Sequence, residues 1–347
     1  MPMGIYVDRG YRTSLGTPFY DRVREVGELE RAIDSWSLVV VYGPRGCGKS
    51  ELVKYFVSRR RGRGIVIDVR KRVLEDLTGV ESVEEVIRGF AELLGLGRVI
   101  DLVEVVERLR RALLHRVTEL VVAIDEYHLL YPDRLTAITR LEAVAGLLAK
   151  NVQLENVKLV LTCSEGFIAT NQVATRLRGY FAKYIPIDGL DEQHFEALYS
   201  EYSRLRGCSA SLELIEFIAG TNPGYLPKLC RLSINDVAWL IESEARVLEE
   251  ALRTIPPTLA REFDNVAQAV LETMDKPIKP AANRELYELA NHMTLHNVLY
   301  PIHTPSGVIH KPQIPLYRTL IELLAEKRRD SVYDVLNEAI ERATKLL

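Results

Sequence analysis

The sequence has few of the features that mark secreted, membrane-bound or metal-stapled proteins. It contains only four cysteines in 347 residues, none in C-x-x-C spacing, so we expect neither a zinc site nor a disulfide framework. No uninterrupted apolar stretch is long enough to span a bilayer, and the first residues lack the basic-then-apolar layout of a signal peptide. We therefore expect a cytoplasmic protein with no membrane partner.

A strong charge of one sign is also missing. The formal net charge is −3, so no global basic field favours nucleic acid as a partner. What the chain does have is the composition of a soluble globular protein, with 47% apolar and 27% charged residues. At 39.4 kDa it is too long for one ordinary core and suits two or three domains.

The most specific motif is a phosphate-binding loop. It matches G-x-x-x-x-G-K-[ST] in full, in the order Gly43, Pro44, Arg45, Gly46, Cys47, Gly48, Lys49, Ser50. An apolar, β-branched run over 38–42 precedes the loop, and a helix-like stretch begins at Glu51. Glycines let backbone N–H groups face phosphates, and the helix N-terminus adds a positive partial charge. We predict that residues 43–51 bind ATP or ADP, that Lys49 bridges the β- and γ-phosphates, and that Ser50 holds Mg²⁺.

An acidic pair follows a second apolar strand. The run over 120–124 enters Asp125 and Glu126 directly. We expect Asp125 to act on Mg²⁺, directly or through water, and Glu126 to polarise the attacking water as a general base. An acid directly after the metal-binding aspartate separates hydrolysing ATPases from kinases, whose acceptor must exclude water. The pair therefore predicts an ATPase and disfavours a P-loop kinase.

Polar residues also end the strand expected over 157–162. Thr162 and Ser164 stand where a residue could sense the γ-phosphate, and we favour Ser164 for that role. Arg176 and Arg178 lie before the next strand, where an arginine acting in trans would sit in a homo-oligomer; a solvated surface arginine is the alternative.

Strands alternate with helices along the first half of the chain. Strands are expected over 38–42, 65–69, 120–124, 157–162 and 184–187, and helices over 82–94 and 102–114. This order predicts an α/β domain at 1–188, with a parallel sheet wrapped by helices.

The second half has a helical pattern. Helices expected over 191–206, 211–219 and 225–242 predict an α-helical lid domain at 189–255. Helices over 259–274 and 283–293, followed by a β-hairpin over 300–310, predict a winged helix in a third domain at 256–347.

Several motifs, taken in order, resemble a known family. They are the stretch Phe19-Tyr20-Asp21-Arg22, the phosphate loop, Ile124-Asp125-Glu126, Leu161-Thr162-Cys163-Ser164 and Gly220-Thr221-Asn222-Pro223. The sequence resembles the archaeal ATPase family, in the AAA+/STAND branch of P-loop NTPases, over about residues 15–240. The resemblance implies an additional-strand, AAA+-like fold with a C-terminal winged helix, and ATP and Mg²⁺ as ligands.

The resemblance also implies contacts with the adenine. It brings Phe19, Tyr20 and Arg22 near the base and sets Pro223 of the lid against it. Thr221 stands where the family has a second glycine, and Cys163 replaces the family's glycine before its sensor serine.

The last third of the sequence does not decide whether the protein acts on DNA or on protein partners. Basic residues there suggest DNA as a partner of the winged helix: Lys276, Lys279, Arg284, Lys311, Arg318, Lys327, Arg328 and Arg329. The helix expected over 283–293 has acids at Glu285 and Glu288, which make a poor recognition surface for DNA. Two interpretations therefore stand: a DNA-associated, nucleotide-driven ATPase, and a STAND-like switch that assembles with protein partners or with its own copies.

Overall fold

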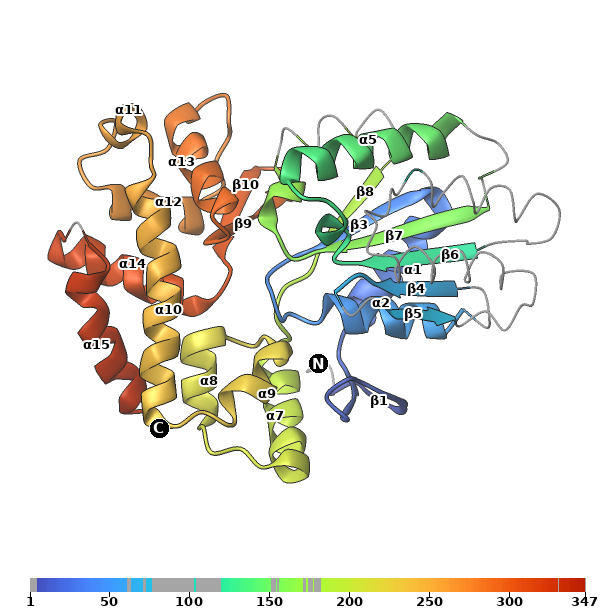
Figure 1. Cartoon of the computed structure of the whole chain (residues 1–347), viewed down its shortest axis with the longest axis horizontal. Helices are drawn as coiled ribbons and strands as arrows, with labels where there is room; N and C mark the ends of the chain where they lie inside the picture. Colours follow the sequence, from blue (N-terminus) through green and yellow to red (C-terminus); the bar gives the residue numbers. More distant parts are fainter. Residues whose placement is uncertain are drawn as a thin grey trace.

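A computed structural model describes residues 5–60, 64–70, 73–76, 103, 120–150, 154, 156–170, 173, 177, 182–329 and 331–346. The helix expected over 82–94 lies outside these residues, as do Arg176, Arg178 and all of 102–114 except residue 103. Figure 1 shows a sheet domain on one side, a group of helices below it, and a C-terminal group of helices and a hairpin on the other side. No helix in the described ranges combines the length and apolar character needed to cross a bilayer.

The central sheet has six strands in the order β5-β4-β6-β7-β3-β8. Their bounds are β3 Leu38–Tyr42, β4 Gly64–Asp68, β5 Val73–Asp76, β6 Leu120–Asp125, β7 Val157–Cys163 and β8 Ala182–Pro186. The edge strand β5 pairs antiparallel with β4, and the other five strands run parallel. The expected α/β fold is confirmed, and β7 lies between β3 and β6 as the additional strand.

The strands of this sheet are buried on both faces, which explains why they are continuous apolar runs. Along β3, Leu38 and Val40 face one apolar core, and Val39 and Val41 face the other. The first core is covered by α5 (Arg134–Lys150) and the second by α1 (Val23–Ser35) and α2 (Lys49–Ser58). Parallel strands covered this way end together at one edge of the sheet, and that edge carries the site.

A small hairpin precedes α1. Strand β1 (Val7–Arg12) pairs antiparallel with β2 (Pro18–Tyr20), which the sequence pattern did not predict. The hairpin is held on the sheet domain by Phe19, whose ring stacks on Tyr55 of α2 with centroids 3.9 Å apart.

The helical lid region differs from expectation in two places. Its helices are α7 (Glu192–Arg206), α8 (Leu212–Ala219), the short turns η5 (Pro223–Tyr225) and α9 (Leu226–Leu229), and α10 (Ile234–Arg253). The prediction of a single helix over 225–242 was wrong, because Ser233 and Asp236 form a capping box that starts a new helix. The expected absence of disulfides was also wrong: Cys208 and Cys230 are joined, because the fold brings together two cysteines that lie far apart in the chain.

The C-terminal region combines helices with one hairpin. It contains α11 (Pro257–Ala260), α12 (Val266–Asp275), α13 (Arg284–Leu295), β9 (Leu299–Thr304), β10 (Gly307–Pro312), α14 (Pro315–Lys327) and α15 (Tyr333–Thr344). The helix expected over 259–274 is therefore two helices. Strands β9 and β10 form the predicted hairpin, and Ile278 adds an isolated bridge to Val308. One apolar cluster includes side chains from both the lid and this region, so the boundary at 255 and the winged helix stay predictions.

Candidate functional site

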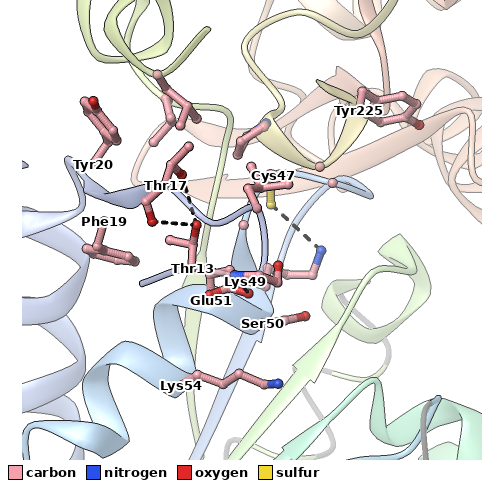
Figure 2. A pocket seen from close by; sticks show the side chains of 18 of the residues that line it. Thr13, Thr17, Phe19, Tyr20, Cys47, Lys49, Ser50, Glu51, Lys54 and Tyr225 are labelled. Carbon is pink, nitrogen blue, oxygen red and sulfur yellow. Dashed lines mark hydrogen bonds between the residues drawn. The ribbon is translucent and has the colours of Figure 1, made fainter. Parts of the chain in front are cut away.

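A cavity of about 420 Å³ opens at the carboxyl edge of the sheet. Its walls come from the β1–β2 turn, the phosphate loop, the ends of β4 and β6, and the lid at 223–228 (Figure 2). Of the predicted site residues it brings together Tyr20, Arg22, Arg45, Gly46, Cys47, Gly48, Lys49, Ser50, Glu51, Asp125, Glu126 and Pro223. Gly43 and Pro44 lie at the base of the loop, and Ser164 lies behind Glu126.

Glycines give the phosphate loop its path. At Gly43, where φ is +154°, an added Cβ would lie 1.9 Å from the carbonyl oxygen of Ile187. At Gly46, where φ is +79°, an added Cβ would lie 2.8 Å from the Tyr225 ring of the lid. Both positions therefore need glycine, for backbone conformation and for space.

The Lys49 side chain lies inside the loop that it follows. Its Nζ donates to the carbonyl oxygens of Gly43, at 3.1 Å, and Pro44, at 2.8 Å, and the residue is only 4% exposed. The Lys49 side chain also acts on Glu126, whose pKa it lowers. The loop therefore presents one fixed cation to an anion that enters the cavity.

Hard oxygen atoms gather where α2 meets the strand ends. Ser50 Oγ donates to Asp125 Oδ1 over 2.9 Å, and Thr162 Oγ1 donates to the same oxygen over 2.5 Å. Asp68, at the end of the neighbouring strand, lines the cavity too. Burial raises the pKa of Asp125 above its usual value. The hydrogen bonds from Thr162 and Ser50 lower this pKa, and the negative charges of Glu126 and Asp68 raise it. Hydroxyl and carboxylate oxygens are ligands that fit Mg²⁺.

Glu126 is held by its backbone and by its side chain. Its φ is +54°, in the left-handed region, and its N–H donates to Thr162 Oγ1 over 2.8 Å. Its Oε2 accepts from the Ser164 N–H at 3.0 Å and from Ser164 Oγ at 2.9 Å, while Oε1 lies 3.6 Å from Arg70. Burial alone would raise the pKa of Glu126, but the Lys49 charge and the bonds from Ser164 lower it overall. The site therefore holds an ionised carboxylate.

The residues expected near the adenine do different things. Arg22 is buried, has a left-handed backbone with φ +67°, and donates to the carbonyl oxygens of Cys47, at 2.6 Å, and Asp188, at 2.7 Å. The Tyr20 hydroxyl donates to Glu201 of α7, so the Tyr20 ring, and not its hydroxyl, lines the cavity. Arg22 thus braces the phosphate loop from behind.

Glu51 and Pro223 both line the cavity. Glu51 accepts from the Ser14 N–H at 3.1 Å, which ties the β1–β2 turn to the start of α2. Pro223 lies close to the phosphate loop, its Cγ 3.7 Å from where a Cβ of Gly48 would lie.

Two distant regions touch the loop directly. The Gly224 N–H of the lid donates to the carbonyl oxygen of Gly46 over 2.8 Å. The Arg45 N–H donates to Gln313 Oε1 of the C-terminal region over 3.3 Å. The lid and the C-terminal region therefore each bond one backbone group of the loop.

Sequence reasoning missed several residues of the cavity. Thr13, Ser14, Leu15 and Thr17 of the β1–β2 turn have no motif that signals a site (Figure 2). Lys54 and Asp68 could have been found, since Lys54 lies one helical turn beyond Ser50 and Asp68 ends the strand beside Asp125.

Comparison with known proteins agrees with this architecture. The sequence matches, over residues 19–229, a family described as an ATPase domain predominantly from Archaea. Among solved structures, the Walker-type ATPase PABY2304 of Pyrococcus abyssi is similar with a TM-score of 0.53 and 20% identity, over 88% of this chain and 96% of that one. The ORC1 protein of Aeropyrum pernix, solved in complex with DNA, gives a TM-score of 0.42 and 15% identity, over 88% of this chain and 94% of that one.

The second of these likenesses is too distant to carry an argument, and the first bears on the fold alone. No curated protein matches the sequence. The family match spans more than half of the chain and contains the phosphate loop, the acidic pair and the lid turn. The chain therefore belongs to the family of ATPase domains found predominantly in archaea.

Proposed function

We propose that the chain binds ATP with Mg²⁺ in the cavity and hydrolyses the γ-phosphate. The observation that carries this proposal is the meeting, in one cavity, of the Lys49 ammonium, the hydrogen-bonded pair of Ser50 and Asp125, and the ionised Glu126. Phosphoryl transfer needs little covalent chemistry from the protein, so positioning and charge in such a site are what accelerate it.

Each residue has a separate task in this mechanism. Backbone N–H groups of the loop and Lys49 balance the negative charge that shifts toward the leaving oxygen. Ser50 and Asp125 would hold Mg²⁺, which supplies a further positive charge on the phosphates. Glu126 orients the attacking water and accepts its proton, and Ser164 keeps one carboxylate oxygen in place.

The nucleoside end of the ATP is expected between the β1–β2 turn and the lid. The Tyr20 ring, Leu15, Leu198 and Pro223 give that end of the cavity an apolar lining. Apolar walls with a few polar groups are typical of sites that bind a planar base. Phe19 lines the cavity too, and its ring stacks on Tyr55 of α2.

Contacts with the loop also support a switch. The lid and the C-terminal region each bond one backbone group of the loop, at Gly46 and Arg45. A nucleotide changes a conformational equilibrium only through contacts that differ between the two states. Engagement of the Arg45 N–H by a phosphate would compete with Gln313 for the same donor, which gives such a difference.

The ion pairs of the C-terminal region favour protein partners over DNA as the output. Five of the eight cations that the sequence offered to DNA are paired with acids: Lys276 with Glu272, Arg284 with Glu288, Lys311 with Asp188, Arg318 with Asp275 and Lys327 with Glu338. A cation that already faces a carboxylate gains less from a phosphate. We therefore favour assembly with proteins or with further copies of this chain, and keep DNA as a tested alternative.

The central test uses two substitutions with different expected results. Glu126→Gln should bind ATP like the parent but release phosphate about 100-fold more slowly, because the amide cannot accept the proton. Lys49→Ala should lose ATP binding itself. Binding is measured with a fluorescent ATP analogue, and turnover as phosphate release with and without Mg²⁺. Parent-like turnover by Lys49→Ala would overturn the proposal.

The output is tested separately. Gel filtration with ATP, with ADP and without nucleotide measures assembly, and a DNA-retention assay at two salt concentrations measures DNA binding. ATP-dependent assembly without DNA supports the protein-switch interpretation. Salt-sensitive DNA retention would instead support a DNA-associated ATPase.

A further inference from the structure

A buried histidine lies directly behind the proposed general base. His128 belongs to the turn η2 (Tyr127–Leu130) that follows Glu126, and it is 9% exposed. It does not line the cavity, and the proposed mechanism gives it no task. Its surroundings are nevertheless polar on both sides of the ring.

The two ring nitrogens of His128 face two carboxylates. Nδ1 lies 3.5 Å from Glu126 Oε2 and 3.4 Å from the Sγ of Cys163. Nε2 lies 3.7 Å from Glu165 Oε1, and the other oxygen of Glu165 accepts from Arg134 Nε over 3.0 Å. A chain of polar groups thus runs from Glu126 through His128 and Glu165 to Arg134.

Arg134 satisfies Glu165, so the imidazole is not needed to balance that acid. The ring makes a T-shaped contact with Phe167, and Arg134 lies over the same Phe167 ring. Cys163 is buried and its pKa is raised by burial, so it stays a neutral thiol that can only be a weak partner for Nδ1. Of the two groups near Nδ1 in the described part of the chain, Glu126 Oε2 is the stronger acceptor.

The protonation state of His128 also matters. Burial lowers the pKa of the imidazole, and the repulsion from Arg45 and Arg70 adds to this, although Glu126 and Glu165 act in the opposite direction. A neutral imidazole carries one proton, and with that proton on Nδ1 the ring is a donor toward Glu126.

From this geometry we infer that His128 is a positioning residue, which directs its Nδ1–H at Glu126 Oε2 and so keeps Oε1 turned toward the attacking water. Ser164 holds Oε2 from one side with two donors, and His128 closes the other side. Oε1 then lies toward the cavity, 3.6 Å from Arg70, which is one of the lining residues. The arrangement follows the general pattern of a base oriented by a third group.

This inference rests on the proposed hydrolysis, and the test keeps the two apart. His128→Asn places an amide N–H near the former Nδ1, and His128→Gln places one near the former Nε2. His128→Ala removes both donors. Steady-state phosphate release gives kcat and KM for each variant, ATP-analogue binding and thermal unfolding report on the fold, and His310→Asn serves as a buried-histidine control outside the site.

The expected result is a loss of kcat of about tenfold or more in His128→Ala and His128→Gln, with KM within about twofold of the parent and with recovery in His128→Asn. Equal losses in all three variants, or no loss in His128→Ala, would overturn the inference while leaving the ATPase proposal intact. Absence of hydrolysis in the parent protein would instead refute the proposed function itself.

Discussion

At the scale of single residues, Glu126 combines a strained backbone with a fully engaged side chain. A non-glycine residue in the left-handed region costs about 1–3 kcal/mol unless its surroundings hold it there. Here Thr162 accepts its N–H, and Ser164 donates twice to its Oε2. Backbone strain that several hydrogen bonds hold in place is typical of residues whose side-chain orientation matters more than their contribution to stability.

The pKa of Glu126 gives a prediction for pH dependence. Burial raises it, but Lys49, His128 and Ser164 lower it below the usual 4.5. The carboxylate therefore stays ionised as the pH falls from 7 to 5, and loss of kcat through its protonation should begin only below about 4.5. Phosphate release measured across this range tests the expectation. Ser164→Ala, which removes one donor, should move the acid limb to higher pH; an unmoved limb would contradict the assignment.

Residues of the site differ in how far they could be predicted. The phosphate loop and the acidic pair are local patterns, and parallel strands bring their ends to one edge, so their meeting follows from the order of elements. The capping function of Ser233, which ends the expected long helix, is local too and could have been seen. Partners such as Gln313 and His128 could not, because their roles depend on where distant backbones pack.

At the scale of elements, the lid turn meets the phosphate loop with almost no space between them. An added Cβ on Gly224 would lie 2.7 Å from Gly46 Cα and 3.0 Å from its carbonyl oxygen. Gly224→Ala should therefore push the lid away from the loop and weaken ADP binding about tenfold, since overpacking of this kind costs about 1–3 kcal/mol. Calorimetric titration with ADP measures the effect.

The matched control for the lid is Gly27→Ala in α1. An added Cβ there meets only the end of a flexible arginine, at 3.6 Å. This substitution should leave ADP binding unchanged and keep the fold. Parent-like affinity in Gly224→Ala would mean that the lid contact does not contribute to nucleotide binding.

The C-terminal hairpin contains a buried imidazole with an unusual environment. His310 of β10 is 0% exposed, and neither ring nitrogen has a hydrogen-bond partner among the described residues. Burial, together with the charge of His303, lowers its pKa from 6.5 to about 3. In the folded chain it stays neutral at pH values where the unfolded chain takes up a proton.

This difference predicts acid sensitivity of the C-terminal region. Between pH 6.5 and about 3 the unfolded state binds more protons at His310, so the free energy of unfolding falls as the pH falls. The limiting slope is about 1.4 kcal/mol per pH unit from this one group. Denaturant unfolding of the parent and of His310→Leu at pH 6.5 and 5 measures it. An equal pH dependence in both proteins would contradict the prediction.

At the scale of the whole molecule, a few contacts join the sheet domain to the C-terminal region. The Asp188 carbonyl oxygen accepts from Arg22, and its carboxylate accepts from Tyr300 and pairs with Lys311. Asp188 is half-exposed, so these bonds contribute specificity more than free energy. Arg22 also donates to the Cys47 carbonyl oxygen, so Arg22 and Asp188 together connect the phosphate loop to the hairpin β9–β10.

The two regions also pack closely at Gly166, in the turn η4 (Gly166–Ala169). An added Cβ there would lie 2.8 Å from Thr294 Cγ2, 3.1 Å from the carbonyl oxygen of Leu299 and 3.2 Å from Tyr300 Cα. The φ of Gly166 is not in the left-handed region, so its backbone tolerates alanine and only the space is lacking. A methyl group at this position acts as a wedge between the domains.

Gly166→Ala should therefore open the molecule by weakening the docking of the C-terminal region by about 1–3 kcal/mol, which lowers the docking equilibrium constant by roughly 5- to 150-fold. Small-angle scattering should show a larger radius of gyration, and proteolysis should be faster in the exposed segments. Thr294→Ser removes the nearest atom that the wedge meets but keeps the hydroxyl bonded to Ala290, so the double variant should recover part of the compact form. If Gly166→Ala is as compact as the parent, or if the double variant is as open as Gly166→Ala, packing of Thr294 at this interface does not control docking.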